Sequence, residues 1–356
     1  MVIATHVVAP YRMTQYVKAE PNWLFTDVVA SLSRLCTNTF VLITGFFFTS
    51  FKRKTATETA VRIVLPVLLY LPFYFFLEID RSFGDAVYRV FIGALTSRYN
   101  MYHLWFVQTF LVLSLVAPIF VNGIEKADRQ THRLVMWTLL TVSSILPTFT
   151  HLTGLMWFDL RLFNAPVVLF MALFVTGAYI RRFPPRLCLS VPATGVVFAA
   201  AQIFIIFGSR LYNSRYSPIN LIKIWTGEIS SLEDPAATLI EVYAMSDSFS
   251  NPNNIVIVAA SVLILILFAC IRVQNTVIPK ITRHIYGAYV IHLFWIVIFS
   301  RVADGYFDLF SPYWHEHNMY PLYVIIYILA VFIVSILTNM TFSFIYQYTK
   351  RRMQGQ

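Results

Sequence analysis

Residues 25–48 read FTDVVASLSRLCTNTFVLITGFFF, an apolar run that carries Arg34 well inside it. In a helix that rises about 1.5 Å per residue, Arg34 lies roughly 12 Å below the start of the run. That depth exceeds what a long side chain spans comfortably to reach the membrane surface. A cation inside a bilayer costs several kcal/mol unless water or a partner compensates its charge. The run therefore predicts a membrane span, and Arg34 predicts a functional site within it.

The composition extends this interpretation to the whole chain. Of the 356 residues, 58% are hydrophobic and only 12% are charged, whereas a typical soluble domain is roughly 25% charged. The apolar runs are long enough for helices and lack the alternation of β-barrel strands. We predict an all-α, polytopic transmembrane helix bundle with nine complete spans, at residues 25–48, 61–79, 104–121, 134–150, 162–180, 189–208, 255–271, 284–301 and 320–346.

The first nine residues read as the end of a further span. They are apolar apart from Thr5 and His6. Nine helical residues cover only about 13 Å of a hydrocarbon core roughly 30 Å thick. The segment also lacks the basic region and cleavage site of a signal peptide. We therefore expect the native chain to start upstream of Met1, so that this truncated first span makes ten spans in total.

The distribution of Lys and Arg sets the expected orientation. If residue 48 faces the cytoplasm, the inner loops hold 16 cations and 3 acids, and the outer segments hold 10 cations and 14 acids, with Arg34 counted apart. The net charge of +10 is then a consequence of topology, and no basic aromatic surface suggests a nucleic-acid partner. We predict a single domain over residues 1–356 with a cytoplasmic C-terminus and a long outer loop at residues 209–254.

The long loop and the cysteines are two further features of the chain. Tyr and Trp lie among acids and amides in the 209–254 loop, which suits either stacking on sugar rings or an interfacial aromatic belt. The three cysteines fall in or beside apolar spans, at Cys36, Cys188 and Cys270. Their spacing is not that of a metal site, so neither a disulfide nor a zinc site is expected.

This topology assigns depths to the polar residues that could carry chemistry. Arg62 and Gly45 lie near the inner ends of their spans, and His292 lies about midway along its span. Three more candidates lie near the outer surface: His6, His103 and Trp105. Together these residues could line a path across the bilayer.

Three segments resemble the acyltransferase-3 family of integral membrane proteins. Ser33 and Arg34, followed by residues 40–46 and then by residues 62–66 (RIVLP), are similar to the second and third spans of that family. Residues 102–106 (YHLWF) are similar to the start of a span with a His-Leu-Trp-Phe element. Residues 283–292 (RHIYGAYVIH) resemble its late span, in which a Gly-x-Tyr-x-x-His pattern recurs.

The resemblance implies an O-acyltransferase of the bacterial cytoplasmic membrane. Such a protein moves an acyl group, usually acetyl from cytoplasmic acetyl-CoA, to a hydroxyl of a cell-envelope polysaccharide or its lipid-linked precursor, with no permanently bound cofactor or metal. His6 falls where the family keeps a histidine near the outer end of its first span. The cation that precedes this histidine in the family would lie before Met1. Thr59 and Arg62 stand where many relatives have two arginines.

Acyl transfer to a hydroxyl needs a base and a group that stabilises the developing oxyanion. We assign these roles to His6, a base near neutral pH, and to Arg34. Arg62 and Arg53, with the neighbouring Lys52 and Lys54, are expected to bind donor phosphates. Gly45 would permit close approach of backbone to a ligand or to another helix. The residues expected to line the cavity are His103, Trp105, Tyr289 and His292.

Each assignment has a structural alternative. Alone, His6, His103 and Trp105 are typical of an interfacial polar and aromatic belt, and Arg62 is typical of a cytoplasmic anchor. Gly45 fits helix packing equally well. Buried Arg and His also suit a carrier or flippase for a lipid-linked or anionic substrate, although no internal repeat supports that function. A glycan polymerase is a weaker third alternative.

Overall fold

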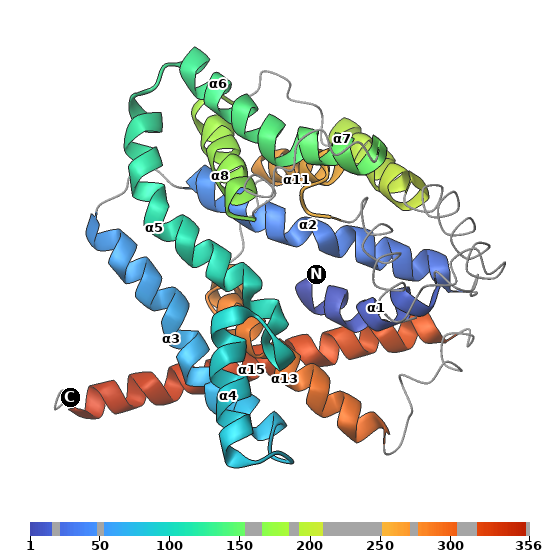
Figure 1. Ribbon diagram of the computed structural model, residues 1–356, viewed down its shortest axis with the longest axis vertical. Coiled ribbons are helices and arrows are strands. Elements are labelled where there is room, and N and C mark those ends of the chain that lie inside the picture. The colour runs from blue at the N-terminus through green and yellow to red at the C-terminus, as the bar shows by residue number, and fades with distance from the viewer. Residues whose placement is uncertain are drawn as a thin grey trace, which may run out of the picture.

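The computed structural model describes residues 1–15, 22–47, 53–153, 166–184, 192–208, 251–270, 277–304 and 319–353. All regular structure in these residues is helical, and the helices cross one another at widely different angles (Figure 1). The predicted outer loop lies outside the described residues except for positions 251–254.

The elements follow the chain in a simple order. The first half contains α1 (Val2–Gln15), α2 (Trp23–Phe47), α3 (Arg53–Leu77), α4 (Phe83–Thr96), the 3-10 helix η1 (Tyr99–Leu104), α5 (Trp105–Lys126) and α6 (Arg129–Leu140). The second half contains the π-helix η2 (Thr141–Ile145), α7 (Leu146–Thr153), α8 (Pro166–Arg182), α11 (Ile255–Cys270), α12 (Val277–Thr282), α13 (Ile285–Asp304) and α15 (Tyr320–Met353).

Four helical segments in the described part of the chain are long and apolar enough to cross a membrane. They are Leu24–Phe47, Phe83–Ala117, Ile285–Val302 and Tyr320–Tyr348. Three shorter apolar helices, Val61–Leu77, Pro192–Gly208 and Ile255–Ala269, also coincide with predicted spans. The protein is therefore an α-helical integral membrane protein, and the number of nine or ten spans stays a prediction.

One boundary differs from the prediction. The apolar segment expected at residues 104–121 begins at Phe83, because α4, η1 and α5 together form one broken helix. Ser97 and Tyr99 mark the break, with positive φ angles of 53° each. The sequence prediction left out α4 because this helix contains charged residues. Two of them neutralise each other, since Arg89 Nε and Asp85 Oδ2 lie 3.1 Å apart. His103 consequently lies just after the break, in η1, and α4 separates it from Phe83.

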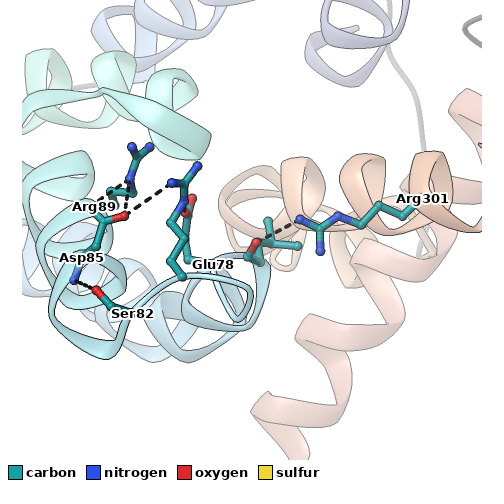
Figure 2. A network of polar contacts seen from close by, with 7 residues as sticks. Glu78, Ser82, Asp85, Arg89 and Arg301 are labelled. Atoms are coloured by element: carbon teal, nitrogen blue, oxygen red, sulfur yellow. Dashed lines mark hydrogen bonds and ion pairs between the residues drawn. The ribbon is translucent and has the colours of Figure 1, made fainter.

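The turn between α3 and α4 is held by polar contacts (Figure 2). Arg81 Nε donates to Glu78 Oε2 at 2.6 Å, and the Ser82 hydroxyl caps α4 by accepting from the Asp85 amide at 3.3 Å. Arg301 at the end of α13 donates to the Leu77 carbonyl at 3.0 Å. These contacts fix the end of α3 against both α4 and α13.

The other end of α13 is tied to the first half of α3. The Tyr286 hydroxyl donates to the Ile63 carbonyl at 2.7 Å, so α3 and α13 run in parallel. Tyr70 donates to Asn339 Oδ1 at 2.7 Å, and this amide lies directly over Gly287, where any Cβ would overlap it. The glycine of the Gly-x-Tyr-x-x-His pattern therefore serves the contact of α13 with α15.

Helix α2 packs backbone to backbone against α8. A Cβ on Gly45 would overlap the Phe174 carbonyl, and a Cβ on Gly177 would overlap the Leu42 carbonyl. Small residues in membrane helices permit such an approach. Arg181 then donates to the Phe46 carbonyl at 3.2 Å, which satisfies a free carbonyl at the end of α2. This geometry supports the packing interpretation of Gly45.

Candidate functional site

Three histidines that are far apart in the sequence meet at one place. His6 comes from α1, His103 from η1 and His292 from α13. The ring centroids of His6 and His292 lie 5.2 Å apart, those of His103 and His292 5.1 Å, and those of His6 and His103 6.4 Å. We call these three residues the imidazole cluster. The structure therefore brings together three of the residues that the sequence singled out.

Helix α13 anchors the cluster to η1. Tyr289 and His292 are three positions apart on α13 and so share a helix face. The Tyr289 hydroxyl donates to the main-chain carbonyl of His103. Its ring lies 5.9 Å from that of His103 and 5.6 Å from that of His292. Tyr289 therefore lies beside the imidazole cluster, and it fixes the relative position of two of the histidines.

His103 is buried and is held through its Nε2 atom. This nitrogen lies 3.1 Å from the Val290 carbonyl and 3.2 Å from the Tyr74 hydroxyl. The Tyr74 hydroxyl donates its own proton to the same Val290 carbonyl at 2.6 Å. Sequence reasoning missed Tyr74, because it stands in an aromatic run (residues 73–76, FYFF) that reads as plain apolar helix.

His6 is half-buried and has a different partner. Its Nδ1 lies 3.2 Å from the Tyr102 hydroxyl, and the two rings meet edge to face at 5.2 Å. Tyr102 was also missed as a site residue. Its signal was its place beside His103 in the YHLWF segment.

Arg34 acts in the same environment. Helices α1 and α2 pack together, and the positive charge of Arg34 acts electrostatically on the His6 imidazole. The predicted base and the predicted charge-stabilising residue are therefore close enough to interact electrostatically. A guanidinium cannot lose its charge in a protein, so Arg34 supplies a fixed positive charge beside an imidazole.

The other predicted residues lie outside the cluster. Arg62 is exposed on α3, next to Ile63, and Tyr74 follows it by 12 positions, or about 18 Å along the helix. The Trp105 ring packs on Phe106 and Phe170, with centroids 6.2 and 6.1 Å away. Arg53 begins α3, and its side chain lies outside the part that the structure describes. Among the described residues, no group of three or more His, Cys, Asp or Glu side chains could hold a metal ion.

The fold and the cluster define an integral membrane protein with buried imidazoles and an arginine gathered among apolar helices. A family model described as an acyltransferase domain, that of the acyltransferase-3 proteins, matches residues 1–340. The chain belongs to this family and is a membrane acyltransferase. Neither the curated proteins nor the solved structures include one that matches the chain.

Proposed function

We propose that the protein transfers an acetyl group from cytoplasmic acetyl-CoA to a hydroxyl of a cell-envelope polysaccharide or of its lipid-linked precursor. Its membership of an acyltransferase family supports the reaction class. The observation that carries the proposal is the meeting of His6 with His103 and His292 at one place, within electrostatic reach of Arg34. The protein acts in the bacterial cytoplasmic membrane, with its C-terminus in the cytoplasm.

His6 is the general base of the proposed reaction. In the tautomer that this mechanism requires, Nδ1–H donates to the Tyr102 hydroxyl, and the Nε2 lone pair takes the proton of the acceptor hydroxyl. The hydroxyl oxygen attacks the thioester carbonyl carbon, so a C–O bond forms while the C–S bond breaks. Arg34 stabilises the oxyanion that develops on the carbonyl oxygen. The proton held by His6 finally passes to the thiolate of CoA, which leaves as the free thiol.

The donor phosphates bind at the other end of α3. Arg62 is exposed there, and a guanidinium binds phosphate in a bidentate manner. Arg53, at the start of the same helix, adds a second cation. CoA carries its thioester at the end of a long flexible arm, so one molecule can place its phosphates near Arg62 and its acyl group near His6.

Sealed inside-out vesicles with isotope-labelled acetyl-CoA test the proposal. We expect label to enter the envelope glycan and a His6→Gln variant to lose at least about 100-fold in rate, the usual scale for a general base. His132→Gln is the matched control, because this buried histidine donates to the Val175 carbonyl on α8, away from the cluster. Substrate movement without covalent transfer of label would favour the carrier instead.

A further inference from the structure

Two nitrogens of the imidazole cluster have no hydrogen-bond partner although they are buried. They are Nδ1 of His103 and Nε2 of His292. A buried polar atom without a partner costs free energy, and such atoms are rare in folded proteins. Whether each nitrogen lacks a donor or an acceptor depends on which nitrogen of the ring carries the proton, and the surrounding contacts decide this.

The contacts of His103 place its proton on Nε2. The Val290 carbonyl can only accept, and the single Tyr74 hydroxyl proton is already donated to that carbonyl at 2.6 Å. Nε2 lies within reach of both oxygens, at 3.1 and 3.2 Å, so it is the donor. A second proton on Nδ1 would add a charge and another unpaired N–H in the protein interior. Nδ1 of His103 is therefore a lone pair.

The contacts of His292 place its proton on the opposite nitrogen. Nδ1 of this ring lies against the Tyr289 carbonyl, which can only accept. Nδ1 therefore carries the proton, and Nε2 presents a lone pair. His292 is completely buried, at 0% exposure. The two rings thus hold opposite tautomers, and each leaves one acceptor nitrogen bare.

We propose that His103 Nδ1 and His292 Nε2 form the acceptor-binding pair of this enzyme. Each nitrogen accepts a hydrogen bond from a different hydroxyl of one ligand, and the ligand therefore carries at least two neighbouring hydroxyl groups, as in a vicinal diol of a sugar or polyol. His103 and His292 are specificity-determining residues that hold the diol beside His6. This inference rests on the proposed function for the identity of the ligand as acyl acceptor.

The chemistry of the pair excludes ligands that offer only acceptor atoms at this position. Phosphodiesters, ionised carboxylates and the thioester carbonyl present only acceptor atoms, and a bare imidazole nitrogen repels them. Any phosphate of a lipid-linked acceptor, and those of CoA, must therefore lie elsewhere. The pair also differs from a single buried acceptor. His132 likewise leaves Nδ1 bare, but its ring is surrounded by Tyr179 and Phe183 and it has no second imidazole beside it among the described residues.

The test uses the full-length protein in lipid nanodiscs with ¹⁵N-labelled histidine, observed by NMR. Ethylene glycol, with two neighbouring hydroxyls, is compared with 2-methoxyethanol, which has one. We expect His103 to be protonated on Nε2 and His292 on Nδ1. Ethylene glycol should shift both bare nitrogens and bind about tenfold more tightly than 2-methoxyethanol, the scale of one additional hydrogen bond. His132 should respond to neither.

Several results would overturn the inference. They are a reversed tautomer in either ring, a doubly protonated ring, equal affinities for the two alcohols, or shifts caused equally by acetate, whose ionised carboxylate can only accept. His103→Gln and His292→Gln serve only to assign the signals, so the test survives poor folding of either variant. The NMR comparison requires no catalytic turnover. Absence of labelled glycan in the vesicle assay would therefore refute the proposed reaction alone, and absence of diol selectivity would refute the binding pair alone.

Discussion

At the scale of single residues, the site depends on which atom of each imidazole is left free. Tyr102 occupies Nδ1 of His6 at 3.2 Å, and this contact decides whether Nε2 can act as the base. The orientation of a catalytic histidine by a second group is a general requirement of proton transfer. In the proposed mechanism, the tyrosine of the YHLWF segment therefore has a positioning role.

Replacing Tyr102 by phenylalanine removes this partner and retains the ring. We expect Tyr102→Phe to lower the rate of acetyl transfer about tenfold, the scale of one lost hydrogen bond. The rate should fall least at low pH, because loss of the acceptor for Nδ1–H also destabilises the inactive protonated ring. Initial rates measured against pH in vesicles test this. Tyr88→Phe, on the exposed face of α4, is the control, and equal rates for both variants would contradict the role.

Arg34 provides the second prediction at this scale. An oxyanion-stabilising group is worth about 100-fold or more in rate, so Arg34→Gln should lose at least that much. Arg34→Lys keeps the charge but not the planar fork, and its rate should be intermediate. Label transfer is measured per amount of folded protein. Arg89→Gln, which breaks an outer ion pair of α4, should stay near the wild-type rate. An Arg34→Gln variant with wild-type turnover would remove Arg34 from the mechanism.

At the scale of elements, the contact of α2 with α8 sets where Arg34 can lie. Gly45 and Gly177 let the two backbones touch, and α2 in turn packs on α1, which carries His6. The broken helix of α4, η1 and α5 plays the same part for His103, since the positive φ angles at Ser97 and Tyr99 turn the chain toward α13.

The glycine contact predicts a sharp difference between two alanine variants. Gly45→Ala places a methyl group on the Phe174 carbonyl, and we expect a loss of stability of about 1–3 kcal/mol or more. Gly123→Ala meets nothing within 4 Å on α5, so it should be neutral or slightly stabilising. Thermal unfolding of the two purified variants in detergent makes the comparison. Similar unfolding temperatures for the two variants would show that α2 and α8 can move apart without a loss of stability.

At the scale of the whole molecule, the orientation in the membrane decides which substrate reaches which end of the site. Two exposed positions, Asp80 after α3 and Gln130 on α6, lie on opposite sides of the membrane in the predicted topology. In a chain whose natural cysteines are replaced by alanine, Asp80→Cys should react in intact cells with a membrane-impermeant maleimide. Gln130→Cys should react only after lysis.

Reporter fusions within residues 209–254 should likewise report a location outside the cytoplasm. The reverse pattern in either assay would mean that the predicted orientation in the membrane is wrong.

The sequence by itself determined the class of fold and the kind of chemistry. Length and hydropathy of the runs require helices in a bilayer, because an unpaired backbone in lipid is too costly, and a deep Arg34 has no other common explanation than a site. His6, His103, Tyr289 and His292 were identified because their segments resemble those of a known family. The start of the broken helix at Phe83 was not predicted, because the paired charges of α4 lowered the apparent hydropathy of this segment.

Only the tertiary structure decided which residues meet. Residues 6, 103 and 292 become neighbours through helix crossings that depend on close packing over long sequence separations, which no local pattern encodes. The same holds for Tyr74, whose hydroxyl finds the Val290 carbonyl on another helix, and for Gly45, whose partner is a carbonyl of α8. The hydrophobic periodicity of the sequence predicts which face each helix buries. The proton positions in the imidazole cluster instead follow from atoms that the neighbouring helices supply.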